Sequence, residues 1–301
     1  MRPILVAGKT GQLARSLVDV AEQRGLPIIA VGRPEFDLED SGSIDRAVDA
    51  ALPRAIVNAA GYTAVDRAES EPERAFAVNR DGAERLAATA RRLQIPFVHV
   101  STDYVFDRRK SSTYFEDDIP CPLGVYGRSK LEGELAVMDT NPDALVFRTS
   151  WVYSPYGTNF LKTVLRLADT QEVVRVVDDQ RGAPTAAIDV ASAIVDALGQ
   201  VNEKTAQTRA GIYHVTAAGE TTWYGFAEAI FAGWGDRGRR VPILQAIATA
   251  DYATPVKRPA NSRLDCGKTD RVFGIRMPLW STSVGACLDV LAASRQDVRS
   301  C

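Results

Sequence analysis

Residues 4–13 read ILVAGKTGQL, an apolar run that ends at a glycine and leads into a helical pattern. Apolar residues then recur at helical spacing up to Gly25, so the stretch predicts a buried strand, a tight turn and a helix. Gly8 would allow the turn, and Gly11 would let backbone approach a pyrophosphate at the helix N-terminus, where free N–H groups lie. An ordinary strand–turn–helix with two turn glycines is the alternative interpretation.

Short apolar runs and helical patterns continue to alternate through the first half of the chain. We expect further strands at 27–31, 55–58, 97–100 and 145–147, with helices between them. Apolar strands separated by helices are typical of a parallel sheet that is covered on both faces. The sequence therefore predicts an α/β fold with a Rossmann-type, doubly wound parallel sheet.

The second half is more irregular and predicts a smaller α+β lobe that packs on the sheet. We expect a dinucleotide-binding domain that comprises residues 1–155 and about 171–200. The remaining parts, about 156–170 and 201–301, form the expected substrate lobe, with segments that cross between the two.

Two helices of the first half have recognisable starts. Ser43 is the expected N-cap of a helix over 43–51, because a serine hydroxyl can accept from a free N–H of the first turn. Pro72 suits the first turn of a long helix that ends near Leu93.

Composition and charge exclude several classes of protein. Of the 301 residues, 46% are hydrophobic and 25% are charged, and the net charge of −2 gives no electrostatic footprint for nucleic acid or an anionic membrane. The four cysteines form no CxxC pair and there are two histidines, so a zinc finger is excluded and no disulfide scaffold is predicted. No signal-peptide pattern opens the chain and no run approaches ~18 apolar residues, so we expect a cytoplasmic protein without a membrane partner.

The end of the second strand bears on the choice of cofactor. It reads Val31-Gly32-Arg33, without the acid that would accept the 2′-hydroxyl of an NAD ribose. Arg33 could instead pair with a 2′-phosphate, or it is a solvated arginine at a strand end. Asp37 either contacts the adenine amino group or caps a turn. The sequence therefore favours NADPH and leaves NADH open.

A tyrosine and a lysine lie four residues apart, at the start of an expected helix over 128–138. This spacing puts Tyr126 and Lys130 on one face, where the ammonium would lower the tyrosine pKa from its usual ~10 and make it a general acid or base. An exposed helix-surface pair is the alternative. Thr102 closes the fourth strand, so its hydroxyl either holds a substrate carbonyl at the edge of the sheet or caps a turn.

Together these motifs resemble the extended short-chain dehydrogenase/reductases and, more closely, the dTDP-4-dehydrorhamnose reductase family. The resemblance extends from residue 3 to about residue 290. The matching segments are GKTGQL at 8–13, VNAAGYTAVDRAESEP at 57–72, VSTDYVFD at 100–107, PLGVYGRSKLEGE at 122–134, FRTSWVY at 147–153, DDQRGAPT at 178–185, YHVTAAGETTW at 213–223 and RPANSRLD at 258–265.

The resemblance implies that Tyr126 donates a proton to the C4 keto oxygen of a nucleotide sugar while NADPH delivers hydride to C4. Lys130 would tune Tyr126 and bind the nicotinamide ribose, and Thr102 would hydrogen-bond the keto oxygen. The reaction would be the last step of dTDP-L-rhamnose synthesis for cell-surface polysaccharide. The expected cofactor contacts are Gly8, Thr10, Gly11, Gln12, Leu13, Arg33, Asp37, Leu38, Ala60, Gly61, Thr63, Tyr126 and Lys130, with Tyr62 beside them.

On the substrate side, the resemblance implies that Asp103 and Trp151 contact the sugar, with a buried core position as the alternative for Trp151. His99 and His214 are expected to be structural residues within strands. The expected contacts of the nucleoside diphosphate are Arg258, Asn261 and Ser262.

Some members of the family hold Mg²⁺ at a dimer contact through acidic residues in the first helix and after the GAPT motif. This chain has Ser16 and Ile188 at those places, and Asp189 is displaced by one residue. The sequence therefore predicts no metal site, and it leaves a monomer and a homodimer open.

Two other functions compete with the reductase. A 4,6-dehydratase of this group typically has Asp followed by Glu after the strand-end threonine, whereas this chain has Asp103 followed by Tyr104. An epimerase must retain its nicotinamide through the cycle, which the sequence does not reveal. A non-catalytic subunit of methionine adenosyltransferase resembles the same family, but it need not keep a Thr–Tyr–Lys set, which is intact here. Oxidation of NADPH on addition of a 4-keto nucleotide sugar would separate the reductase from these alternatives.

Overall fold

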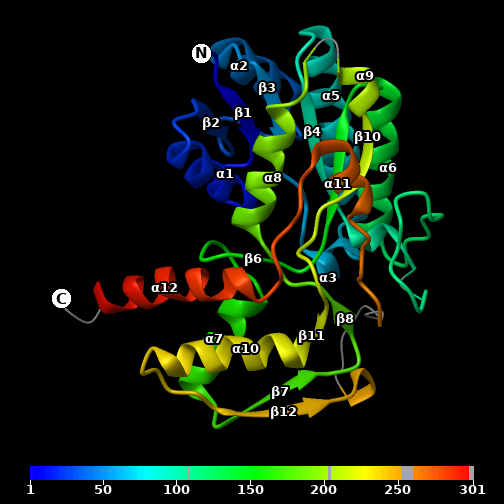
Figure 1. The fold of residues 1–301 in the computed structure, drawn as a ribbon. Helices are drawn as coiled ribbons and strands as arrows, with labels where there is room; N and C mark the ends of the chain where they lie inside the picture. Colours follow the sequence, from blue (N-terminus) through cyan, green and yellow to red (C-terminus); the bar gives the residue numbers. More distant parts are fainter. Residues whose placement is uncertain (108, 203–204, 252–259, 298–301) are drawn as a thin grey trace.

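The computed structural model describes residues 1–107, 109–202, 205–251 and 260–297, which form two packed bodies (Figure 1). The upper body is built on a six-stranded sheet, and the lower body holds shorter sheets and three of the longer helices. Within the described ranges, no helix is both long enough and apolar enough to cross a membrane.

The large sheet confirms the predicted doubly wound arrangement. Its strand order is β10-β5-β4-β3-β1-β2, and every neighbouring pair is parallel. β1 lies between β2 and β3, so the winding reverses beside β1, the kind of position at which open α/β sheets bind ligands. The strands are β1 (Ile4–Ala7), β2 (Ile28–Val31), β3 (Ala55–Asn58), β4 (Phe97–Thr102), β5 (Leu145–Thr149) and β10 (Gly211–His214).

Helices cover both faces of this sheet (Figure 1). α1 (Gln12–Gln23) and α8 (Ala187–Leu198) pack their apolar residues on one face. α2 (Ser41–Ala51), α5 (Gly82–Arg92) and α6 (Val125–Thr140) pack on the other. Because helices bury it from both sides, β1 is a continuous apolar run rather than an alternating one.

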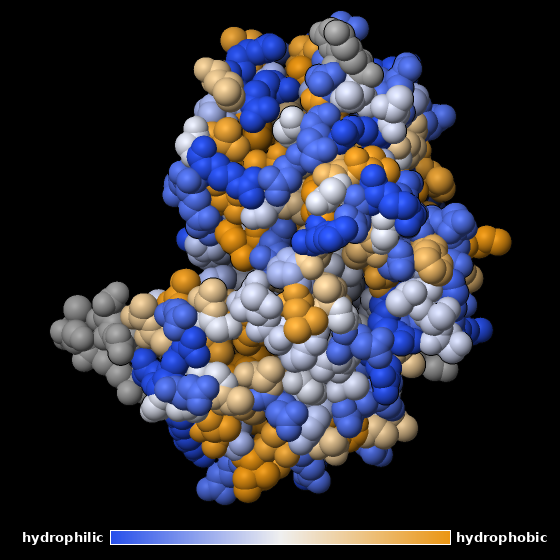
Figure 2. All heavy atoms as spheres, in the orientation of Figure 1, coloured by the Kyte–Doolittle hydropathy of each residue, from blue (hydrophilic) through white to orange (hydrophobic). Residues whose placement is uncertain are grey.

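A second hydrophobic core lies in the lower body. It joins α7 (Phe160–Thr170), β7 (Val173–Val177), α10 (Trp223–Asp236), β12 (Ile243–Ile247) and α12 (Thr282–Asp297). β7 and β12 form a two-stranded parallel sheet at the foot of the molecule. Figure 2 shows hydrophobic residues gathered there, and the exposed residues of this sheet include Val173 and Ile243.

Two strands lie in a different body from the one that the expected domain boundaries imply. β10 falls in the expected substrate lobe, but it pairs with β5 as an edge strand of the large sheet. β7 falls in the expected dinucleotide-binding domain, but it pairs with β12 and packs in the lower core. Both pairings join segments that are far apart in the chain. The division of the chain into two domains stays a prediction.

Shorter elements connect these layers. They are α3 (Val65–Ala68), α4 (Pro72–Phe76), the π-helical turn η1 (Ala77–Asp81), the 3-10 turns η2 (Asp103–Val105) and η3 (Thr249–Asp251), β6 (Val152–Tyr153) paired with β9 (Thr185–Ala186), β8 (Arg181–Gly182) paired with β11 (Thr221–Thr222), α9 (Ala206–Arg209) and α11 (Gly267–Phe273). The helix expected from Pro72 to about Leu93 is present as α4, η1 and α5 in succession.

The predicted cap of α2 was wrong. The N-cap is Asp40, whose carboxylate accepts from the Gly42 N–H at 2.9 Å. The hydroxyl of Ser43 instead donates to the carbonyls of Asp37 and Asp40 from inside the first turn. A serine so placed ties the preceding loop to the helix rather than capping it.

Candidate active site

The loop between β1 and α1 borders a large cavity. Gly8 has a φ of +115°, which favours glycine, and a Cβ there would lie 3.4 Å from both the Ala14 Cβ and the Ala59 backbone. A Cβ at Gly11 would meet nothing within 4 Å. Gly11 is also the N-cap of α1 without a side-chain cap, so it leaves the first N–H groups of the helix to other acceptors. An open helix N-terminus of this kind suits a pyrophosphate.

One cavity of about 1140 Å³ joins this loop to the expected catalytic residues. It extends into the lower body, where Phe160, Val174 and Trp223 line it. The expected residues that line it are Gly8, Thr10, Gly11, Gln12, Leu13, Arg33, Asp37, Leu38, Ala60, Gly61, Thr63, Thr102, Asp103, Tyr126, Lys130 and Trp151. The structure therefore brings together residues that the sequence spreads over 144 positions, from 8 to 151; their individual roles stay predictions.

Gln12 links the loop between β1 and α1, the expected phosphate loop of residues 8–13, to the lower body. Its side-chain oxygen accepts from the Ser154 hydroxyl at 3.0 Å and from the Asn159 amide at 2.8 Å. Asn159 is in turn the N-cap of α7, where its own oxygen accepts from the Lys162 N–H. Ser154 and Asn159 were not singled out from the sequence, because nothing local connects them to residue 12.

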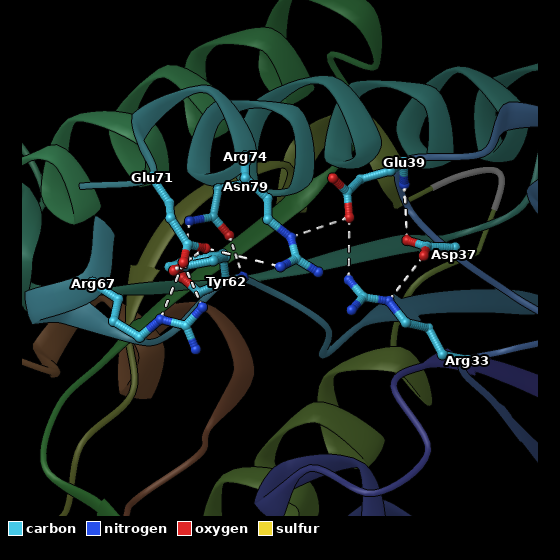
Figure 3. A network of polar contacts seen from close by, with 8 residues as sticks. All are labelled: Arg33, Asp37, Glu39, Tyr62, Arg67, Glu71, Arg74 and Asn79. Atoms are coloured by element: carbon cyan, nitrogen blue, oxygen red, sulfur yellow. Dashed lines mark hydrogen bonds and ion pairs between the residues drawn. The ribbon is translucent and has the colours of Figure 1, made fainter. Parts of the chain in front are cut away.

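Arg33 lies in a network of charges where β2 ends (Figure 3). Its guanidinium pairs with the Asp37 carboxylate at 2.9 Å and with the Glu39 carboxylate at 3.3 Å. The strand end itself has no acid, as the sequence indicates, but the following loop supplies two. The Arg33 side chain is 53% exposed, so solvent screens these pairs.

The network continues through Arg74 to Glu71 (Figure 3), and neither residue is among those that line the cavity. Arg74 approaches Glu39 at 3.5 Å and Glu71 at 3.8 Å, and Glu71 accepts from the Tyr62 hydroxyl at 2.9 Å. Burial and this hydrogen bond raise the pKa of Tyr62. Tyr62, expected beside the cofactor, is not among the residues that line the cavity. Its N–H donates to Asn79 of the π-helical turn at 2.8 Å, which holds the chain after β3 in place.

Thr102 ends β4 and lines the cavity. Its hydroxyl donates to the Asp103 carboxylate and accepts from the Tyr104 N–H, both at 3.2 Å. Thr102 thus caps η2 while its side chain borders the cavity. The two interpretations of this threonine are therefore compatible.

Tyr126 and Lys130 lie in the first turns of α6 and line the same cavity. α6 can approach η2 because Gly127 has no side chain: a Cβ there would lie 2.2 Å from the Tyr104 carbonyl oxygen. The Tyr104 ring contacts the Tyr126 ring edge to face, with 5.2 Å between centroids. The close approach holds Tyr126 against the segment that follows Thr102.

Lys130 does not form an exposed pair on the helix surface. It is 4% exposed, and its Nζ lies 2.7 Å from the Val100 carbonyl oxygen and 3.1 Å from Nε2 of His99. Burial lowers the pKa of Lys130 to about 8, against the influence of Glu134 on the same helix. His99 was expected to be only structural, and its contact with Lys130 has no signal in the sequence.

Trp151 lines the cavity, as expected for a residue that contacts the sugar. Its ring stacks on Trp223 with 3.6 Å between centroids and 12° between planes. The stack lies tightly against β8, since a Cβ at Gly182 would lie 2.6 Å from the Trp151 ring. Trp223 ends one of the matching segments, but its contact with Trp151, 72 positions away in the chain, has no signal in the sequence.

Two of the three expected diphosphate contacts, Asn261 and Ser262, do not line this cavity. Arg258 lies outside the described residues. The buried Asn261 amide donates to the carbonyls of Lys110 and Ser112, at 2.6 and 2.7 Å. Ser262 is buried as well, and neither Asn261 nor Ser262 lines the cavity. Their part in binding a diphosphate stays a prediction.

The positions compared with the Mg²⁺ site of relatives have other surroundings. Ser16 is buried in α1, and Asp189 accepts from the Ser283 hydroxyl at 2.6 Å. In the part of the chain that the structure describes, no group of three or more His, Cys, Asp or Glu side chains could hold a metal ion. The expected absence of a Mg²⁺ site stays a prediction.

Proteins of known function resemble this chain along nearly its whole length. Residues 1–293 match the family described as RmlD substrate binding domain. The dTDP-4-dehydrorhamnose reductase of Sinorhizobium fredii is 47% identical over 281 residues, 93% of this chain and 94% of the relative; that of Burkholderia thailandensis is 44% identical over 295 residues, 95% and 97%. The Bacillus anthracis enzyme in complex with NADP has a TM-score of 0.86 at 29% identity, over 96% of this chain and 99% of that one. The chain therefore belongs to the dTDP-4-dehydrorhamnose reductases, a family of NAD(P)H-dependent oxidoreductases.

Proposed function

We propose that this chain uses NADPH to reduce the C4 keto group of dTDP-4-dehydro-β-L-rhamnose to dTDP-L-rhamnose, the last step of dTDP-rhamnose biosynthesis. The single observation that carries the proposal is the cavity that the phosphate loop shares with Thr102, Tyr126 and Lys130. The names of the relatives support the substrate, and the NADP complex of one relative supports the cofactor. The proposed enzyme is cytoplasmic and works as a monomer or a homodimer.

The residues around the phosphate loop fit a dinucleotide. Gly11 leaves open space at the uncapped N-terminus of α1, where a pyrophosphate would accept from backbone N–H groups. Arg33 would break its ion pair with Asp37 or Glu39 and pair with the 2′-phosphate of NADPH instead. NADH has no such phosphate and stays the alternative cofactor. The bound cofactor would supply the hydride that the C4 carbon receives.

Tyr126 is the proposed general acid. As C4 is reduced, its oxygen gains negative charge and takes the proton of the Tyr126 hydroxyl. The Thr102 hydroxyl, which donates to Asp103 in this structure, would turn to the same oxygen and stabilise the developing charge. Lys130 as an ammonium would favour the resulting phenolate.

The stacked rings of Trp151 and Trp223 would form an apolar wall beside the sugar. A 6-deoxy sugar carries a methyl group and C–H faces, which pack well on aromatic rings. Asp103 borders the same space and could accept from a sugar hydroxyl.

An assay of the purified protein tests this proposal. We expect dTDP-4-dehydro-β-L-rhamnose to cause oxidation of NADPH, followed by absorbance, with dTDP-L-rhamnose as the product on chromatography. NADH in a parallel reaction gives the cofactor preference, and other 4-keto-6-deoxy nucleotide sugars give the substrate range. Absence of turnover with every keto sugar would refute the proposal and favour a non-catalytic binding protein.

A further inference from the structure

Asn58, His99 and Lys130 form a buried polar chain that the proposed reaction leaves unexplained. His99 Nε2 lies 3.1 Å from Lys130 Nζ, and His99 Nδ1 lies 3.1 Å from Asn58 Nδ2. The exposed fractions of Asn58, His99 and Lys130 are 1%, 0% and 4%. The polar atoms of Asn58 and His99 must therefore find their partners within this trio and in the neighbouring backbone, while Lys130 also borders the cavity.

The backbone fixes the orientation of the Asn58 amide. Its oxygen accepts from the Ala60 N–H at 3.2 Å, so its Nδ2 faces His99. An amide nitrogen can only donate, so Nδ1 of His99 must accept and the neutral ring carries its proton on Nε2. Burial, together with the nearby charge of Lys130, keeps the ring neutral by lowering the pKa of His99 well below its usual value.

The proton on Nε2 then points at Lys130. Nζ of Lys130 also lies 2.7 Å from the Val100 carbonyl, which can only accept. An uncharged amine satisfies both neighbours, because one N–H donates to the carbonyl and the lone pair accepts from Nε2–H of His99. An ammonium has no lone pair, so it fits only when the ring proton sits on Nδ1, and that form loses the hydrogen bond from Asn58.

We propose that His99 is a positioning residue whose tautomer is coupled to the protonation of Lys130, and that Asn58 favours the form with the uncharged amine. In the Nε2–H form His99 donates to the amine, and in the Nδ1–H form it accepts from the ammonium. The net change between the two states is the uptake of one proton by the pair. Asn58 thereby opposes the charging of Lys130 through the ring between them.

Other charged groups face this chain from the helix and the next strand. Glu134, four residues along α6, favours the ammonium form of Lys130, but the Arg148 guanidinium of β5 holds its carboxylate at 2.6 Å. Tyr126 lies on the same helix. Burial dominates, and the pKa of Lys130 is lowered to about 8, in the direction that the Asn58–His99 pair also favours.

The consequence for catalysis rests on the proposed function. A lysine that titrates near neutral pH can support the Tyr126 phenolate as an ammonium and can also give up its charge. His99 would set how easily that charge is gained. The coupling itself needs no turnover, so it can be measured apart from the reaction.

Nuclear magnetic resonance of the full chain with isotope-labelled histidine tests the coupling. The chain has two histidines, and long-range proton–nitrogen correlations distinguish the two tautomers from the imidazolium. His214 is a reference of the opposite form, because its Nδ1 lies 3.2 Å from the Asp265 carbonyl, which can only accept. Burial lowers the pKa of His214 to about 3, so its form should stay constant over the titration.

We expect His99 to be Nε2–H above the pKa of Lys130 and to shift to Nδ1–H as the pH falls through it. Nδ1–H at every pH would overturn the proposal.

A second measurement follows the pKa of Lys130 through the resonance of its side chain, which Lys130→Met assigns. His99→Phe should raise this pKa, whereas His214→Phe should leave it unchanged. A lowered pKa in His99→Phe would mean that the ring only accepts, which contradicts the coupling. If wild-type protein shows the coupling but reduces no keto sugar, the proposed function fails and the coupling stands.

Discussion

The two ends of the cavity differ in how their charged groups are held. At the expected catalytic end, Lys130 is 4% exposed and its nitrogen has two fixed neighbours. At the expected adenosine end, the Arg33 side chain is 53% exposed and pairs with both Asp37 and Glu39. Charge interactions are stronger where water is excluded, so loss of one group should cost more at the catalytic end. If the proposed roles hold, burial would fix the protonation chemistry of Lys130, while the exchangeable ion pairs of Arg33 at the surface would set the choice between NADPH and NADH.

The largest effect is expected from Tyr126→Phe. Loss of the proposed proton donor should reduce turnover by about 10²–10⁴-fold, the usual contribution of general acid catalysis. The ring and its contact with Tyr104 remain, so the dissociation constant of NADPH should change little. Steady-state rates and fluorescence titration measure the two quantities. Tyr156→Phe is the matched control, since its hydroxyl binds Asp19 away from the cavity, and a wild-type rate in Tyr126→Phe would reject the assignment.

Lys130→Met should reduce kcat and raise the KM for NADPH together. Methionine fills the buried space without the charge that favours the Tyr126 phenolate and without the proposed donor to the cofactor ribose. We expect a smaller loss of kcat than in Tyr126→Phe, because the hydroxyl that donates the proton is still present. A change in KM with an unaltered kcat would show that the lysine only binds the cofactor.

The burial of Lys130 should also appear in the pH dependence of stability. Its pKa is about 8 in the folded chain against an ordinary value of 10.5, so the unfolded chain binds more protons between these values. The free energy of unfolding should therefore gain a contribution that rises with pH from about 8 to about 10.5. Denaturant melts of wild type and Lys130→Met measure it, with Lys9→Met as an exposed control. Parallel pH profiles for wild type and Lys130→Met would contradict the burial of an ionisable amine.

Arg33→Ala tests the exposed end. A charge-assisted hydrogen bond contributes roughly 1.5–3 kcal/mol, and an exposed site lies near the lower bound, so NADPH should bind about tenfold more weakly. NADH should bind almost unchanged, and the loss for NADPH should shrink at high salt. Equal losses for both cofactors would place Arg33 on the adenine ring instead of the phosphate.

Asp37→Asn should have the smallest effect and the opposite sign. It removes a competitor for Arg33 and a negative charge that would repel the 2′-phosphate. Exposed ion pairs are worth up to about 1 kcal/mol, so the KM for NADPH should fall by at most about fivefold. Glu22→Gln, a change on the far part of α1, serves as the control for altered net charge. A raised KM for NADPH would mean that Asp37 contacts the cofactor itself.

Much of the sheet could be predicted because its signals are local. Residues 4–13 hold a strand, a turn and a helix start in one short stretch, and the other apolar runs repeat the pattern. The pairings of β10 with β5 and of β7 with β12 could not be predicted, because parallel strands that pair are joined by long crossover connections. The predicted N-cap of α2 was wrong because Asp40 and Ser43 are both suitable N-cap residues, and only the path of the preceding loop decides between them.

In the candidate site, too, local signals could be predicted and contacts between distant segments could not. Thr102, Tyr126 and Lys130 could be selected from strand ends and helix spacing, and the cavity brings them together. The chain from Asn58 through His99 to Lys130 could not be predicted, because it needs β3, β4 and α6 to converge at one point. Asp37 was singled out as a cofactor contact, but its ion pair with Arg33 and that of Glu39 were not predicted, since a loop returns both acids to a strand end that itself lacks an acid.

The most direct test of the proposed reaction follows the hydride. Purified protein would be given dTDP-4-dehydro-β-L-rhamnose and NADPH that carries deuterium at the transferable position of the nicotinamide. Reduction at C4 by this cavity predicts dTDP-L-rhamnose with one deuterium, located at C4 of the sugar by mass spectrometry and magnetic resonance, and almost no product from Tyr126→Phe. Product without deuterium, or with deuterium at another carbon, would contradict the proposed reaction.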